Sequence, residues 1–174
     1  PILTSCCPAW VKFFEHKFQD MLDVPSTAKS PQQMFGAIAK TYFAGKLGIP
    51  REKMVVVSVM PCLAKKYECS RPEFFVNGNP DVDLSVSTRE LAHMIKRANI
   101  DFVNLPDGDF DGPMGESTGA GVIFGTTGGV IEAATRTAVE IYTGKPLDSV
   151  DFLALRGFEG CREARVKVGD LELH

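Results

Sequence analysis

The chain has 174 residues, of which 44% are hydrophobic and 24% charged, with a formal net charge of −3 at pH 7. This length and composition fit one soluble domain with a buried core. The slightly acidic balance and the absence of a basic run argue against a nucleic-acid surface, and no apolar stretch is long enough to span a bilayer. We therefore expect neither a nucleic-acid partner nor a membrane span.

Cysteine usage indicates free thiols. Five cysteines are an odd number in a chain too large to need stapling, so a disulfide framework is not expected. A reducing or anaerobic setting fits better, and we expect a cytoplasmic location with the periplasm as the alternative. The three histidines show no metal-ligand spacing to a cysteine, and we expect His16, His93 and His174 at the surface.

Two adjacent cysteines open the first predicted helix. Residues 4–10 are TSCCPAW, and Pro8 suits the first position of a helix that the apolar spacing extends to Leu22. Cys6 and Cys7 then lie at a helix N-terminus, where free N–H groups and the helix dipole favour the thiolate. A thiolate can bind metal or react. The alternative is a pair of small buried apolar side chains.

The second predicted helix begins with a capping signal. Ser30 can cap it, Pro31 takes the first position and Gln33 completes a capping box. The helix ends near Gly48. Its apolar stripe consists of Met34, Phe35, Ile38, Tyr42, Phe43 and Leu47.

A β-branched run follows at residues 54–59 and predicts a strand buried on both faces. Its carboxyl end leads into residues 60–68, MPCLAKKYE. In open α/β sheets, ligands gather outside the carboxyl ends of strands, beside the next helix N-terminus. Both cysteine motifs are therefore expected on turns that lead into helices.

The rest of the chain alternates strand and helix. Residues 83–86 predict a short strand, and Ser87 with Glu90 forms a capping box for the next helix. The glycine-rich stretch 104–129 lacks the Gly-Lys-Ser/Thr ending of a phosphate-binding loop, so we interpret its glycines as sites of close backbone approach, with nucleotide binding as the alternative. A helix is expected at residues 130–142. Strand patterns follow at 152–155 and in a Gly-Asp hairpin at 166–173.

These elements predict an α/β fold with a largely parallel sheet flanked by helices and a C-terminal β-hairpin. We expect residues 1–174 to form one domain.

Through its two cysteine motifs, the chain resembles the catalytic (H-cluster) domain of the large subunit of di-iron (FeFe, iron-only) hydrogenases. The first two of that family's three signature stretches match residues 4–10 and 60–66. The resemblance continues through residues 26–33, 88–91 and 119–125, and so covers nearly the whole chain. It implies an oxidoreductase that reversibly converts protons and electrons to hydrogen at a 4Fe-4S cubane joined through a cysteine sulfur to a di-iron unit.

The resemblance also implies roles for particular residues. Cys7 and Cys62 would ligate the cubane. Cys6 would pass protons to and from the amine of the di-iron unit, with Ser26 next on the relay. Lys65 would donate to a cyanide on the distal iron, the alternative being a solvated lysine on the first turn of a helix.

Four further residues would line an apolar pocket around the di-iron unit and exclude water from it. They are Pro31, Gln32, Met60 and Phe124.

The chain departs from the family in one respect. A cubane requires four cysteine thiolates, and the family's third signature, a Cys-x-x-x-Cys followed by glycines, does not occur in these 174 residues. Cys69, if helical, would lie about 10 Å along the axis from Cys62 at about 1.5 Å per residue, and Cys161 matches no ligand stretch. Both are expected to be structural or incidental. We therefore expect a piece truncated before the third signature, two of whose three cluster-binding motifs are present.

In isolation this piece is expected to be inactive and to lack the H-cluster. Two alternatives stay open at this point: it folds alone, or it self-associates through an apolar face. The parent would exchange electrons with ferredoxin or another carrier. A hydrogenase-like iron–sulfur assembly protein or a sensory hydrogenase relative, neither with turnover, is the alternative function. An assembly protein has no need for the thiol of Cys6 or for Lys65, so their presence favours the enzyme.

Overall fold

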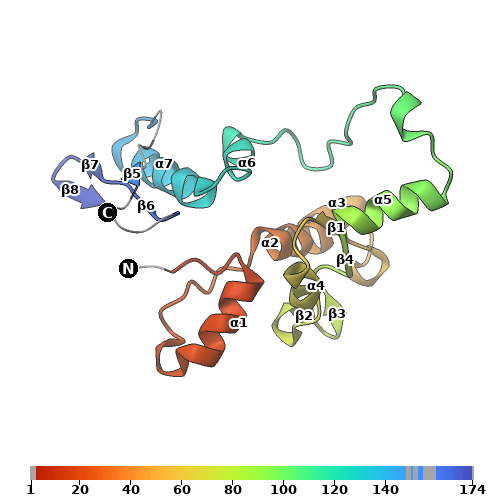
Figure 1. The fold of residues 1–174 in the computed structure, drawn as a ribbon, viewed down its shortest axis with the longest axis horizontal. Helices are drawn as coiled ribbons and strands as arrows, with labels where there is room; N and C mark the ends of the chain where they lie inside the picture. The colour runs from red at the N-terminus through yellow and green to blue at the C-terminus, as the bar shows by residue number, and fades with distance from the viewer. Residues whose placement is uncertain (1–2, 148–149, 151–152, 155–159, 174) are drawn as a thin grey trace. The chain divides into compact units, whose positions relative to one another are not determined.

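The structure is a computed structural model that describes residues 3–147, 150, 153–154 and 160–173. The chain divides into two compact units, Pro1–Pro113 and Met114–His174 (Figure 1). Each unit is described by itself. None of the helices in these ranges combines the length and apolar character of a membrane-spanning segment.

The first unit contains the described helices and short helical turns that precede residue 114. The α-helices are α1 (Pro8–Lys17), α2 (Pro31–Ile38), α3 (Ala44–Leu47), α4 (Ala64–Cys69) and α5 (Thr88–Arg97). A π-helical turn, η2 (Ala39–Phe43), joins α2 to α3. The 3-10 turns are η1 (Gln19–Met21), η3 (Arg51–Lys53), η4 (Pro72–Phe74) and η5 (Phe102–Asn104).

A parallel strand pair lies at the centre of the first unit. Strand β1 (Val57–Met60) pairs with β4 (Leu84–Ser87), with Val57 opposite Leu84. Helices α4 and α5 pack against this pair. A short antiparallel pair, β2 (Phe75–Val76) and β3 (Asn79–Pro80), lies between them in sequence.

The predicted helix boundaries hold where a local cap defines them. Pro8 begins α1 with Cys7 as the N-cap, and Ser87 and Glu90 form the complete capping box of α5. Ser30 caps α2 by accepting from the backbone N–H of Gln33. The predicted return bond of Gln33 is not made: its side-chain oxygen has no hydrogen-bond partner among the described residues, and its amide nitrogen lies 4.0 Å from the sulfur of Cys69.

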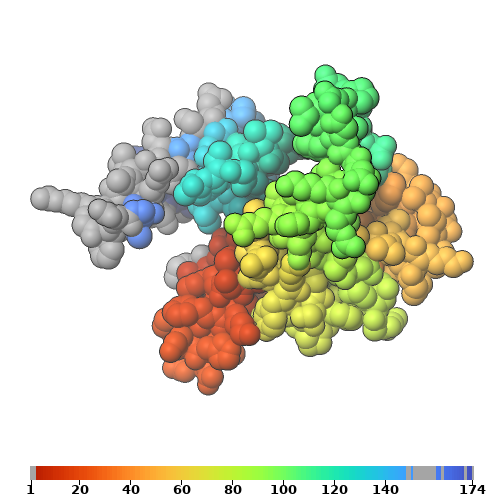
Figure 2. Space-filling model, turned by 45° about the vertical axis from the view of Figure 1, so that its right-hand side comes forward, coloured from red at the N-terminus to blue at the C-terminus, as the bar shows by residue number. Residues whose placement is uncertain are grey.

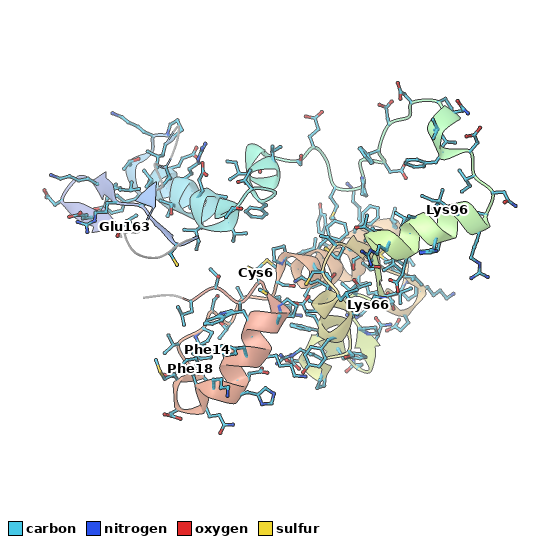
Figure 3. The ribbon with its side chains drawn as sticks, viewed as in Figure 1. Cys6, Phe14, Phe18, Lys66, Lys96 and Glu163 are labelled. Atoms are coloured by element: carbon cyan, nitrogen blue, oxygen red, sulfur yellow. The ribbon has the colours of Figure 1, made fainter. Side chains whose placement is uncertain are left out.

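Helix α1 is shorter than expected. It ends at Lys17, and the chain continues as η1 in place of the helix predicted to Leu22. Phe14 is buried, and its ring lies 5.1 Å from that of Phe18 (Figure 3). This aromatic contact allows the chain to turn back at Phe18.

The apolar stripe of the second helix faces solvent. Phe35, Ile38 and Tyr42 are 53%, 49% and 62% exposed. The opposite face is buried and polar, and includes Gln32 and Lys40. The ammonium of Lys40 is held by Asp83 at 2.7 Å and by the carbonyl of Pro80 at 2.7 Å, so its charge is paired as a buried charge must be.

The prediction that the first strand is buried on both faces is wrong for this chain. Val57 and Val59 of β1 are 51% and 46% exposed. In the described part of the chain β1 pairs with β4 alone, and the side chains that alternate with these valines face the covered side.

The second unit has two helices and two antiparallel strand pairs. They are α6 (Gly119–Ile123), α7 (Gly129–Thr143), β5 (Leu153–Ala154), β6 (Arg162–Glu163), β7 (Val166–Val168) and β8 (Leu171–Leu173). The predicted Gly-Asp hairpin is β7–β8, with Val166 opposite Leu173 and Val168 opposite Leu171. Phe152 and Leu155 of the predicted strand 152–155 lie outside the described residues.

One glycine shows the close backbone approach that we expected in the glycine-rich stretch. A Cβ atom on Gly129 would collide with the carbonyl of Ile123. Gly128 has φ +79° and Gly144, which ends α7, has φ +69°, a left-handed conformation that glycine adopts without strain. The α/β class, the parallel pair and the C-terminal hairpin are thus present as predicted.

A glycine-to-alanine pair tests how closely α2 packs on the segment before β4. A Cβ on Gly36 would lie 2.5 Å from the carbonyl oxygen of Asp81, whereas one on Gly45 meets nothing within 4 Å. We expect Gly36→Ala to lower the free energy of unfolding by about 1–3 kcal/mol through overpacking. Gly45→Ala should leave it unchanged or raise it by about 0.5–1 kcal/mol. Urea unfolding of both variants checks this, and equal effects would contradict the packing.

Candidate functional site

The two cysteine turns lie at the N-terminal ends of two helices. The carbonyl of Cys7 accepts the first α1 bond from the N–H of Val11 at 3.0 Å. The carbonyl of Cys62, two residues before α4, accepts from the N–H of Lys65 at 3.2 Å. The thiols of Cys7 and Cys62 are exposed. Both are therefore accessible to a ligand, as metal-binding cysteines must be.

Lys65 joins the two turns. Its side-chain nitrogen donates to the carbonyl of Cys6 at 2.8 Å, while its backbone N–H donates to the carbonyl of Cys62. One residue thus contacts the main chain of both cysteine turns. The Lys65 side chain is only 12% exposed, so the alternative of a solvated lysine is wrong.

Contacts along their length hold α1 and α4 together (Figure 2). The ammonium of Lys12 lies 4.4 Å from the ring centre of Tyr67, a cation–π contact. Arg71, just after α4, forms an ion pair with Glu15 of α1. Hydrogen bonding to Glu15 raises the pKa of Arg71 further above its ordinary value, so this link stays charged.

Three of the four predicted pocket residues line one hollow. Pro31, Gln32 and Met60 lie around a cavity of about 330 Å³ beside β1. The amide of Gln32 also reaches the carbonyl of Lys65 at 3.4 Å, which connects this hollow to the lysine. Phe124 lies in the second unit, directly after α6, and is 44% exposed.

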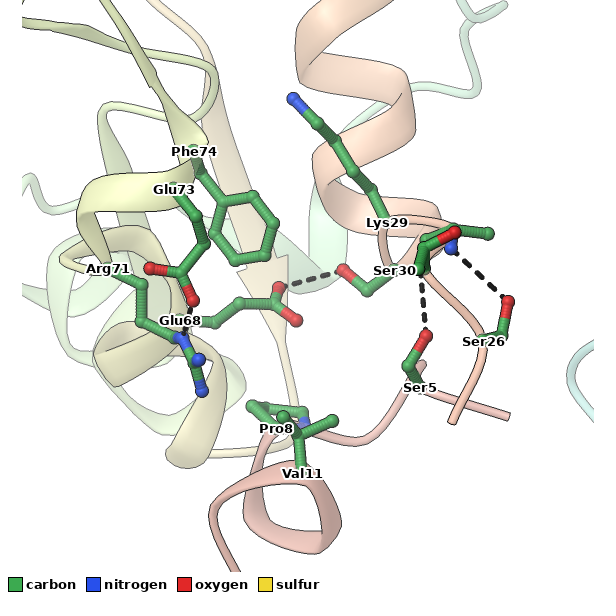
Figure 4. A pocket seen from close by; sticks show the side chains of 12 residues that line it. Ser5, Pro8, Val11, Ser26, Lys29, Ser30, Glu68, Arg71, Glu73 and Phe74 are labelled. Carbon is green, nitrogen blue, oxygen red and sulfur yellow. Dashed lines mark hydrogen bonds and ion pairs between the residues drawn. The ribbon is translucent and has the colours of Figure 1, made fainter. Parts of the chain in front are cut away.

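Ser26 lies beside the segment that leads to Cys6. Its backbone N–H donates to the carbonyl of Leu3 at 2.7 Å, and its hydroxyl accepts from the N–H of Ala28. Ser5 donates to the carbonyl of Ala28 at 2.8 Å (Figure 4). Ser5 and Ser26 both line two cavities of about 180 and 230 Å³. The relay from Cys6 to Ser26 stays a prediction.

The other cysteines and the histidines lie outside the two cysteine motifs. Cys69 is buried; burial, reinforced by the charge of Glu68, raises the pKa of its thiol, which disfavours the thiolate. Cys161 is exposed in the second unit. His16 and His93 are exposed, as expected, and His174 lies outside the described residues.

Sequence reasoning missed Glu68. This carboxylate is 3% exposed and accepts hydrogen bonds from Ser30, Gln32 and Lys65. The available signal was its position three residues after Lys65 on a helix, where opposite charges meet. That signal predicts a surface pair, and only the fold shows that the pair is buried.

The donor set fits part of an iron–sulfur cubane. Cys7 and Cys62 supply two accessible thiols on neighbouring turns, and a cubane requires four thiolates. Among the described residues no group of three or more His, Cys, Asp or Glu side chains could hold a metal ion. These residues therefore suit two of the four ligand positions.

The first unit combines helices and a parallel strand pair with two accessible thiols and a paired lysine at adjacent helix N-termini. The sequence-family profile described as the C-terminal domain of the iron only hydrogenase large subunit matches residues 1–174. The chain belongs to this family, which confirms the resemblance found from the motifs.

Individual relatives agree. The chain is 75% identical over 173 residues to the NADP-reducing hydrogenase subunit HndD of Solidesulfovibrio fructosivorans, covering 99% of this chain and 30% of that protein. It is 53% identical to the periplasmic Fe hydrogenase large subunit of Nitratidesulfovibrio vulgaris, covering 99% of this chain and 41% of that protein. A solved structure of a variant of the FeFe-hydrogenase HydA1 from Chlamydomonas reinhardtii matches with TM-score 0.82 and 43% identity, covering 95% of this chain and 41% of that one.

A more distant relative shares the name NAR1 with cytosolic Fe-S cluster assembly factors. Protein NAR1 of Arabidopsis thaliana is 32% identical over 170 residues, covering 90% of this chain and 36% of that protein. The chain thus spans well under half the length of each of these curated relatives.

The ion pair between Lys66 and Glu90 predicts how the stability of the fold depends on pH. Glu90 receives hydrogen bonds from Lys66 and from the backbone and side chain of Ser87, which lower its pKa from 4.5 to about 2. A depressed folded-state pKa means that the charged carboxylate stabilises the fold above its unfolded pKa, and that this contribution is lost as the pH falls from about 4.5 toward 2. We expect Glu90→Gln to lower the melting temperature near pH 7 and to converge with the unsubstituted protein in acid. Melting curves from pH 7 to 2 test this, and a pH-independent difference would contradict it.

Proposed function

We propose that the protein containing this chain is an FeFe hydrogenase that reversibly reduces protons to hydrogen. The observation that supports this most is the joining of the Cys6–Cys7 and Cys62 turns by Lys65. The cofactor, when bound, supplies the redox chemistry and the site of hydrogen formation.

In this proposal the chain's own residues hold and shield the cofactor. Cys7 and Cys62 provide two of the four thiolates of the 4Fe-4S cubane, and the remaining thiolates come from outside these 174 residues. The ammonium of Lys65 offers a charge-assisted donor to an anionic ligand. Pro31, Gln32 and Met60 exclude water around the hollow beside β1. The family resemblance assigns the same task to Phe124.

The thiol of Cys6 holds and passes a proton in this proposal. Cys6 is partly exposed, and Ser5, its neighbour, lines the same cavities as Ser26. The shared position of Ser5 and Ser26 on the walls of both cavities supports Ser26 as the next group on the relay. An assembly protein of the NAR1 kind is the alternative, and the bonded position of Lys65 favours the enzyme.

The electron partner and the compartment are also proposals. We propose ferredoxin or another carrier as the electron partner. The name of the relative at 75% identity supports NADP as an alternative electron acceptor. We propose the cytoplasm as the location, and the periplasmic relative keeps the periplasm as the alternative.

Serine substitutions in the full-length protein test the two cluster ligands. We expect Cys7→Ser and Cys62→Ser each to lower the iron bound per protein and to abolish hydrogen evolution with reduced viologen, because a hydroxyl replaces a thiolate ligand. Cys161→Ser, which changes another exposed cysteine, is the control and should retain both. Full iron content and turnover in Cys7→Ser or Cys62→Ser would refute the assignment.

The 174-residue chain alone should behave differently. With two of four thiolates, it should show no hydrogen turnover after anaerobic reconstitution with iron, sulfide and the di-iron unit.

We also propose that the 174-residue chain self-associates through the exposed stripe of α2. Phe35→Lys with Ile38→Glu should then shift it toward the monomer in analytical ultracentrifugation. An unsubstituted chain that stays monomeric at all concentrations would contradict the proposed self-association. Robust hydrogen turnover by the reconstituted chain would contradict the expectation that it is inactive.

A further inference from the structure

Glu68 is a buried carboxylate to which the proposed chemistry assigns no task. It is 3% exposed, and a buried charge is tolerated when it is paired and hydrogen-bonded. Its oxygens accept from the hydroxyl of Ser30 at 2.8 Å, the amide of Gln32 at 3.0 Å and the ammonium of Lys65 at 3.2 Å. Figure 4 shows Glu68 directed at Ser30.

The three donors come from two helices. Ser30 is the N-cap of α2 and Gln32 lies in its first turn, whereas Lys65 lies one turn before Glu68 on α4. The amide oxygen of Gln32 also accepts from Ser58 of β1 at 2.7 Å. Glu68 therefore fixes the start of α2 and the strand β1 relative to the lysine.

The contacts of Lys65 leave one donor available. A lysine ammonium has three N–H donors, and one of them serves the carbonyl of Cys6. The two oxygens of Glu68 lie at the same distance, 3.2 Å, as expected when they share one donor. The third N–H is then free for an acceptor beside the cysteine turns.

We propose that Glu68 is a positioning residue that holds the Lys65 ammonium between the cysteine turns, so that its third N–H meets an anionic ligand of the bound cofactor. This inference rests on the proposed function. It predicts that Glu68 acts through Lys65, which distinguishes it from a residue that only stabilises the fold.

Infrared spectra of the cofactor-loaded full-length protein test this, because cyanide stretching bands respond to hydrogen bonds at the ligand. We expect Lys65→Met to shift a cyanide band, and Glu68→Ala to shift the same band in the same direction. In a Lys65→Met background, Glu68→Ala should produce no additional shift. Lys66→Met and Glu90→Gln, which remove the neighbouring surface pair, are the controls and should leave the bands in place.

An isosteric variant covers the case in which Glu68→Ala does not fold or load. Glu68→Gln keeps one acceptor oxygen and loses the charge, and we expect it to shift the band less than Lys65→Met does. Unshifted bands in Glu68→Gln, or an additive shift in the double variant, would overturn the inference. If the unsubstituted loaded protein shows no carbonyl or cyanide bands, the proposed function itself fails.

Discussion

The ammonium of Lys65 and the carbonyl of Cys6 are separated by 59 positions in the sequence and by 2.8 Å in the fold. The backbone of the same lysine bonds to Cys62, so the relative placement of the two cysteine turns depends on where this side chain is held. Glu68 holds it from one side, and the packing of α1 on α4 fixes the frame. This contact is the direct link between the two turns, and the Arg71–Glu15 pair and the packing of α1 on α4 support it.

The interior around this contact is unusually polar. Ser30, Gln32 and Glu68 are all buried, and the first two donate to the third, although the exposed face of α2 is apolar. Buried polar groups are costly unless they are hydrogen-bonded, and satisfied networks fix one arrangement of the elements that contribute to them. In this chain the network joins α2, β1 and α4 at the point where the cysteine turns meet.

The sequence predicted features that depend on neighbouring residues. The start of α1 at Pro8, the capping box of Ser87 and Glu90 and the Gly169–Asp170 hairpin all follow from side chains and backbone angles within a few positions. The two cysteine motifs also fell on turns into helices. The family resemblance, and not the neighbouring residues, implied that Pro31, Gln32 and Met60 share one hollow.

Features that depend on distant partners were not predicted. The apolar stripe of α2 is exposed and the valines of β1 are half-exposed because no described element covers those faces. Local periodicity predicts that an element has an apolar face, but it does not predict whether another element covers that face. From the sequence, Glu68 is predicted to be a surface carboxylate that pairs with Lys65. In the structure Ser30 and Gln32, at the start of another helix, bury it and donate hydrogen bonds to it. The placement of Phe124 and the function of the Cys6–Ser26 relay came from the family resemblance and stay predictions.

The convergence of the Cys7 and Cys62 thiols is the central claim, and thiol cross-linking measures it most directly. Dibromobimane becomes fluorescent when it bridges two nearby thiols, and a Cys6→Ala background removes the competing neighbour. In the metal-free protein, the account predicts a fluorescent product whose bridge maps by mass spectrometry to Cys7 and Cys62. Separate modification of these two cysteines without a bridge would contradict it.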